Sequence, residues 1–239
     1  MCHWSIAGEW TNGTSGVTEN VICPADGTVL GELPHASKED LDDALNSSLE
    51  GFNKWRSETP LNRQSILEKA AKILEREFDK NSENLTREMG KPLAEAKIEM
   101  QVAIDLLRWY GEEGKRVYGR IIPSRIPNME HEARKVPVGP VLAFVAWNFP
   151  ATNVMRKVAG ALAAGCSITI KPSEETPATA IAIGKALMEA GLPAGVLNIV
   201  FGVPSEVSEH LLASPIPRKL SFTGSCLLYT SDAADEHSW

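Results

Sequence analysis

The 239-residue sequence lacks a basic leader, a long apolar run and any stretch of concentrated positive charge. The opening MCHWSIAGEW has no basic segment followed by an apolar one, so no secretory leader is expected. The longest apolar run falls well short of the roughly 20 residues that span a bilayer. These absences exclude a membrane-spanning protein and predict a cytoplasmic one.

Positive charge is scarce, since the formal net charge is −7 at pH 7. The sequence contains no block of Lys and Arg and no basic amphipathic segment. This excludes nucleic acids and anionic membranes as partners. We therefore expect small molecules as ligands.

A cysteine framework is also absent. The four cysteines are Cys2, Cys23, Cys166 and Cys226, and they lie far apart with no CxxC pair and no His at ligand spacing. Neither a zinc or other metal site nor a set of disulfides is predicted. Cys166 precedes a buried strand, where a small inert apolar residue is the usual interpretation.

What the sequence does contain is an ordinary core-forming composition, 43% apolar and 23% charged, arranged in two patterns. Residues 1–35 alternate in short pieces typical of a small β element or an extended arm. Helical spacing follows from Ser37, whose side chain and the acid at Asp40 form a capping pattern. Apolar residues predicted on the buried faces of the first and fourth helices include Leu49 and Ile98. Pro60 opens the second helix and Gly90 ends the third.

Residues 119–139 contain scattered Pro and show no helical period. We expect an extended hairpin that leaves the body of the domain or contacts another subunit.

The second half alternates short apolar strands with helices. Strands are expected at 141–147, 167–171, 196–201 and 219–222, and helices at 150–164, 177–190 and 205–213. This alternation predicts an α/β fold with a parallel sheet and helices on both faces. Ligands of such sheets bind at the carboxyl ends of the strands.

Polar clusters lie at these predicted strand ends, although the GxGxxG fingerprint is missing. They are Asn148, 171–174, Gly202 and 223–225. The two glycine loops would let backbone approach a phosphate. Lys171 and Glu174 would hold the hydroxyls of a ribose, the alternative being a solvated ion pair in a loop.

Three ordered segments carry a family resemblance: PVGPVLAFVAWNFPATNVMRKVAGALAAGCSITIKPSEETPATA, AGLPAGVLNIVFG and RKLSFTGS. They resemble the NAD(P)-dependent aldehyde dehydrogenase superfamily, most closely its succinate-semialdehyde dehydrogenase branch, from about Gly8 to Ser225. The resemblance implies a Rossmann-like cofactor domain, an oligomerisation arm, and attack of a Cys thiolate on the aldehyde with hydride passing to the nicotinamide.

The resemblance assigns roles to residues around the first strand end. Asn148 matches the amide that donates to the developing oxyanion, and an uncharged donor suits that task because it does not titrate. Trp147 and Phe149 match walls of the nicotinamide and substrate cavity, the alternative being core packing. Arg156 matches an Arg that binds the distal carboxylate of a semialdehyde. The alternative places Arg156 and Lys157 together on a solvent-facing helix surface.

Cofactor residues follow in the same way. Lys171 and Glu174 match the pair that holds the adenosine ribose, and a carboxylate at the 2′-hydroxyl repels a 2′-phosphate, so NAD is expected rather than NADP. The other residues matched to cofactor loops are Trp147, Ser173, Gly202, Gly224 and Ser225.

The expected organisation is an N-terminal arm and helical layer (1–118), a hairpin (119–139), a βαβ cofactor portion (140–225) and a tail without family counterpart (226–239). Family members place the general-base Glu and nucleophilic Cys later in the chain. We therefore expect the catalytic domain to be absent and this chain to be inactive alone, whereas full-length members form homo-oligomers. The alternative is a non-catalytic dinucleotide-binding fragment.

Overall fold

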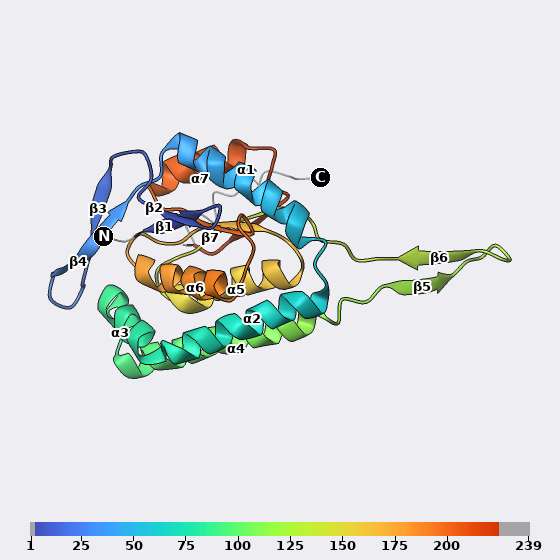
Figure 1. Ribbon diagram of the computed structural model, residues 1–239, viewed down its shortest axis with the longest axis horizontal. Coiled ribbons are helices and arrows are strands. Elements are labelled where there is room, and N and C mark those ends of the chain that lie inside the picture. Colours follow the sequence, from blue (N-terminus) through green and yellow to red (C-terminus); the bar gives the residue numbers. More distant parts are fainter. Residues whose placement is uncertain (1–2, 225–239) are drawn as a thin grey trace, which may run out of the picture.

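A six-stranded sheet lies at the centre of the computed structural model, which describes residues 3–224 (Figure 1). The strand order is β10-β7-β8-β9-β1-β2. The first four strands pair in parallel, whereas β1 pairs antiparallel with both of its neighbours, β9 and β2. The strands are β10 (Lys219–Phe222), β7 (Val141–Phe144), β8 (Ile168–Lys171), β9 (Leu197–Ile199), β1 (Trp4–Ile6) and β2 (Glu9–Thr11). Every residue of β7, β8 and β9 is buried, as expected for parallel strands covered on both faces.

Helices cover both faces of this sheet, and a further helical layer lies outside one of them (Figure 1). One face carries α1 (Lys38–Trp55) and α7 (Pro204–Ala213). The other carries α5 (Pro150–Ala163) and α6 (Pro177–Glu189), and outside these lie α2 (Pro60–Arg76), α3 (Phe78–Met89) and α4 (Leu93–Gly114). The predicted α/β architecture with a parallel sheet and an N-terminal helical layer is confirmed. No helix in the described part is long and apolar enough to cross a membrane.

Local signals set several helix ends as predicted. The Ser37 hydroxyl accepts from the backbone N–H of Asp40 at 3.1 Å, and the Asp40 carboxylate accepts from the Ser37 N–H at 2.8 Å. Pro60 is the first residue of α2. Gly90 ends α3 with a φ of 85°, a conformation that glycine adopts without steric cost.

Two predicted core residues are wrong. Ile98 is 66% exposed, and Leu49 is also exposed. The buried stripe of α4 consists of Ala96, Glu99, Met100, Ala103, Ile104 and Leu107. Glu99 lies on that stripe and Ile98 lies beside it, because adjacent helical residues are turned by about 100°.

Strand β7 is shorter than the predicted 141–147. It ends at Phe144, and the chain leaves the sheet before Trp147, which is exposed. The last part of the apolar run therefore forms a loop above the sheet edge.

The hairpin predicted over 119–139 is present and projects far from the body of the molecule (Figure 1). It consists of β5 (Arg120–Pro123) and β6 (Glu130–Ala133), antiparallel and exposed along their whole length. A second small sheet pairs β3 (Thr18–Ile22) with β4 (Val29–Pro34), as the β element expected near the N-terminus.

Candidate functional site

The carboxyl ends of the parallel strands form one edge of the sheet. Phe144 pairs with Phe222 on β10 and with Lys171 on β8, so these three strands end in line. Because the strands are parallel, the polar segments that follow them emerge on the same side. The sequence-predicted clusters therefore share one edge, as expected from the βαβ pattern.

Lys171 and Glu174 form a close ion pair at this edge. The Lys171 Nζ lies 2.6 Å from Glu174 Oε1, and the two side chains are only 7% and 13% exposed. Glu174 Oε1 also accepts from the backbone N–H of Gly202 at 3.2 Å. The pair is therefore a fixed junction between the loops after β8 and β9, and the alternative of a solvated loop pair is wrong.

Two other predicted cofactor residues, Ser173 and Gly224, lie in the loops after β8 and β10, at the same edge of the sheet. Ser173 is half-buried and its hydroxyl bonds the carboxylate of Glu175. Gly224 is exposed just beyond β10, where the N–H of Thr223 donates to the Phe144 carbonyl at 3.0 Å. Ser225 lies outside the described residues.

The segment from Trp147 to Phe149 is exposed between β7 and α5. Both aromatic side chains are 51% exposed, so core packing does not explain them. The side-chain oxygen of Asn148 accepts from Asn153 Nδ2 at 3.2 Å. With its oxygen held in this way, the Asn148 amide presents its NH₂ group as a donor.

A pocket of about 380 Å³ opens beside this segment, between α4 and α5. Its apolar walls include Ile98, Val102 and Phe149, which explains why Ile98 is exposed although it is apolar. Arg156 supplies a cation and Glu95 an anion to the lining.

Arg156 and Lys157 do not share one solvent face. Arg156 is exposed at the pocket, whereas Lys157 turns toward β10 and its Nζ lies 3.1 Å from Ser221 Oγ. Partial burial lowers the pKa of Lys157, and the neighbouring charge of Arg156 lowers it further. The alternative that both simply end in solvent is therefore wrong for Lys157.

Sequence reasoning missed a buried ion pair beneath the Asn148 segment. Lys91, just after α3, pairs with Glu99 of α4, and its Nζ lies 4.2 Å from the centroid of the Phe149 ring. Glu99 Oε1 accepts from the backbone N–H groups of Ala151 and Thr152 at 2.9 and 3.1 Å. An acidic residue within the apolar stripe of a helix is the signal that could have revealed it.

Glu88 of α3 contacts the start of α6 in the way that Glu99 contacts the start of α5. It accepts from the N–H groups of Ala178 and Thr179 at 2.8 and 2.9 Å, and also from the Thr179 hydroxyl. Burial raises the pKa of Glu88 to about 7, against the lowering effect of these hydrogen bonds.

Both described cysteines are buried. Cys166 is 2% exposed and precedes β8, at the opposite edge from Asn148, in agreement with the predicted inert role. Cys23 is buried near β3. Among residues 3–224 no three His, Cys, Asp or Glu side chains are grouped to hold a metal ion.

Comparison with known proteins gives concordant results. The family model described as "Aldehyde dehydrogenase family" matches residues 10–230, which extends past Ser225, where the sequence resemblance was expected to end. The 4-(hydroxymethyl)benzenesulfonate dehydrogenase TsaD1 of Comamonas testosteroni is 47% identical, covering 92% of this chain and 46% of that protein. The NADP(+) succinate-semialdehyde dehydrogenase GabD of Escherichia coli K12 is 39% identical with the same coverage.

The structural comparison agrees. A crystal structure of succinate-semialdehyde dehydrogenase from Burkholderia pseudomallei matches with a TM-score of 0.93 and 39% identity, covering 95% of this chain and 47% of that chain. The chain thus spans about half the length of the curated relatives it matches.

Proposed function

Because the chain belongs to the aldehyde dehydrogenase family, we propose that residues 140–225 form the cofactor portion of an enzyme that oxidises an aldehyde to the acid. The observation that carries this proposal is the shared carboxyl edge, where the Lys171–Glu174 junction and the exposed Asn148 amide follow the neighbouring strands β8 and β7. NAD(P)⁺, when bound, would accept the hydride from the substrate.

We propose that NAD⁺ is preferred over NADP⁺. Glu174 is fixed by Lys171 and by Gly202 N–H, so its carboxylate keeps one position at the ribose site. A 2′-hydroxyl can donate to it, whereas a 2′-phosphate meets its negative charge. The relative GabD is named for NADP(+), so membership of the family does not by itself decide the preference.

Asn148 is proposed as the oxyanion donor. Its side-chain oxygen is occupied by Asn153, which leaves the NH₂ group for a substrate oxygen. Such a donor stabilises negative charge that develops during attack on the aldehyde, and loss of one typically lowers the rate by about 10²–10³.

The proposed substrate is a small aldehyde with a distal carboxylate, such as succinate semialdehyde. The pocket beside Asn148 offers apolar walls at Ile98 and Val102 and a guanidinium at Arg156. A planar guanidinium binds a carboxylate through two hydrogen bonds. Relatives named for succinate semialdehyde and for glutarate semialdehyde support this substrate class.

We propose that the 239-residue chain does not oxidise aldehydes by itself. The mechanism expected for the family needs a Cys thiolate next to the oxyanion donor, whereas both described cysteines, Cys23 and Cys166, are buried, and Cys166 precedes β8 at the opposite edge of the sheet from Asn148. The hairpin over 119–139 is proposed as an oligomerisation arm.

Ligand-observed saturation-transfer NMR tests the cofactor site, because it detects binding in the millimolar range. With the purified chain we expect signals from the adenosine ribose protons of NAD⁺, and their loss in Lys171→Met. Absence of signal from both NAD⁺ and NADP⁺ would overturn the cofactor site. In parallel, aldehyde-dependent NADH formation that disappears in Asn148→Ala would contradict the proposed inactivity of the chain alone.

A further inference from the structure

Helix α5 has no capping side chain at its own N-terminus. Its N-cap residue, Phe149, makes no side-chain hydrogen bond, in contrast to Ser37 at the start of α1. The first N–H groups of a helix have no partner within the helix and must be satisfied from elsewhere. At α5 a residue about fifty positions earlier in the chain supplies that partner.

The donors of the first turn are fully accounted for. Pro150 has no N–H, Ala151 and Thr152 donate to Glu99, and Asn153 donates to the Phe149 carbonyl at 2.8 Å. A carboxylate placed here is also favoured by the positive end of the helix dipole. Glu99 therefore fixes where α5 begins, and with it the position of the preceding loop.

Lys91 links the same carboxylate to that loop. Its Nζ pairs with Glu99, lies 3.5 Å from the Asn148 carbonyl oxygen and sits over the Phe149 ring. The Lys91 and Glu99 side chains are only 6% and 3% exposed. Separating the partners of such a buried pair would leave each charge uncompensated, so the two side chains stay together in one geometry.

Asn148 is thus held at two points. The Lys91 Nζ lies near the backbone carbonyl oxygen of Asn148. Asn153, on the turn that Glu99 caps, donates a hydrogen bond to the Asn148 side-chain oxygen. We propose that Lys91 and Glu99 are positioning residues for Asn148, which set the direction in which its amide NH₂ points. The inference rests on the proposed role of Asn148 as oxyanion donor.

The chain offers two controls. Glu95 lines the same pocket one helical turn before Glu99 but is exposed, so Glu95→Gln changes local charge without touching the cap. Glu88 caps α6 in the same way that Glu99 caps α5, so the amides of Ala178 and Thr179 report on an equivalent turn that neither Lys91 nor Glu99 caps.

The test uses ¹⁵N-labelled chain, with the Asn148 side-chain resonances assigned by their loss in Asn148→Asp. In Glu99→Gln we expect hydrogen exchange at Ala151 and Thr152 to accelerate at least about tenfold, because their hydrogen bonds pass from a charged to a weaker, neutral acceptor. Exchange at Ala178 and Thr179 should stay unchanged, and the Asn148 NH₂ resonances should shift or broaden. Lys91→Met should also shift the Asn148 resonances. Lys91→Arg, which keeps the positive charge, should leave them near their positions in the unmodified chain, and so should Glu95→Gln.

Unchanged Asn148 resonances in Glu99→Gln and Lys91→Met would overturn the proposal, since the pair would then be a cap without influence on the amide. Equal acceleration at both helix starts would overturn it too, because it would indicate general destabilisation. If Glu99→Gln fails to fold, Lys91→Met and Lys91→Arg carry the test. Unchanged Asn148 resonances in Lys91→Met, or equal acceleration of exchange at both helix starts, would then overturn the proposal. None of these signals depends on aldehyde oxidation or dinucleotide binding. A failure of the proposed function is therefore seen separately, in the NADH assay and in the saturation-transfer measurement with NAD⁺.

Discussion

The carboxylate of Glu174 accepts a hydrogen bond from the backbone N–H of Gly202, 3.2 Å away and 28 residues later in the chain. The contact joins the loop after β8 to the loop after β9, and Lys171 completes it from the end of β8. Both loops therefore reach the proposed cofactor site as one unit.

Replacing Gly202 tests how much this junction depends on backbone shape. Gly202 has a φ of 152°, and an added Cβ would lie 3.0 Å from Val207 Cγ2. We expect Gly202→Ala to lower the free energy of unfolding by roughly 1–3 kcal/mol, measured by urea denaturation. Gly191→Ala is the control, because its φ is also positive (96°) but nothing lies within 4 Å of the new Cβ. Equal losses in the two variants would show that the Val207 contact is harmless.

Glu174→Gln tests the cofactor preference. Removing the negative charge should bring the affinities for NAD⁺ and NADP⁺ closer together, because the repulsion of a 2′-phosphate is lost. Competition of the two dinucleotides in saturation-transfer NMR measures the ratio. Glu175→Gln is the control, since Glu175 is exposed and bonds Ser173 rather than Lys171. An unchanged ratio in Glu174→Gln would contradict the assigned role.

Glu88 should make stability depend on pH. Burial raises its pKa to about 7 from an ordinary value of 4.5, so the folded state binds more protons than the unfolded state between these values. The contribution of Glu88 is therefore fully present below about pH 4.5 and is lost as pH rises through 7, a change of about 3 kcal/mol. Glu88→Gln should remove this slope from urea denaturation measured between pH 5 and 8.

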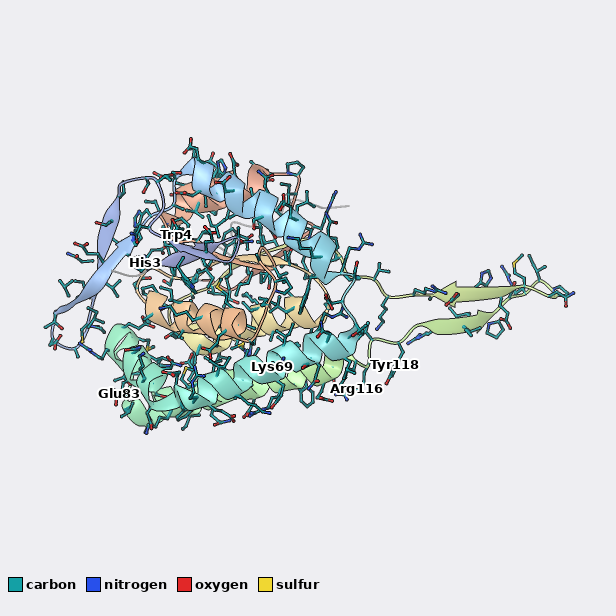
Figure 2. The ribbon with its side chains drawn as sticks, in the orientation of Figure 1. His3, Trp4, Lys69, Glu83, Arg116 and Tyr118 are labelled. Carbon is teal, nitrogen blue, oxygen red and sulfur yellow. The ribbon has the colours of Figure 1, made fainter. Side chains whose placement is uncertain are left out.

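Glu83→Gln is the matched control for that titration. Glu83 lies on the same helix, α3, at the outer edge of the helical layer (Figure 2), and its side chain is exposed. Its replacement should leave the pH dependence as in the unmodified chain. A slope that persists in Glu88→Gln would assign the pH dependence to another group.

Arg156→Gln tests the pocket as a site for the distal carboxylate. We expect at least about tenfold weaker binding of succinate semialdehyde, because a charge-assisted bidentate contact is lost. Chemical-shift titration of the α5 amides measures the affinity. Lys157→Gln should bind as the unmodified chain does, since Lys157 is directed toward Ser221. A similar loss in both variants would point to general attraction of an anion.

The hairpin should mediate self-association if it is the proposed arm. Ile121 and Val136 are 73% and 76% exposed on it, and a single chain leaves these apolar side chains in water. Sedimentation velocity should show oligomers that dissociate in Ile121→Asp. A monomeric unmodified chain at micromolar concentration would contradict this role for the isolated chain.

Local sequence determined most of the framework. The alternation of apolar strands and helices predicted the parallel sheet, and it also predicted that the polar strand ends share one edge, because βαβ connections run successive strands in the same direction. Ser37, Pro60 and Gly90 marked helix ends correctly because each acts through the backbone of its immediate neighbours.

The tertiary structure decided which side chains meet. Ile98 is exposed, contrary to expectation, and Glu99 is buried, because α4 packs on α5, where a carboxylate is needed at an uncapped helix start. Lys91 reaches the Asn148 segment only when the helical layer is in place. Contacts between residues so distant in sequence leave no periodic or spacing signal, since they depend on how separately determined elements pack together.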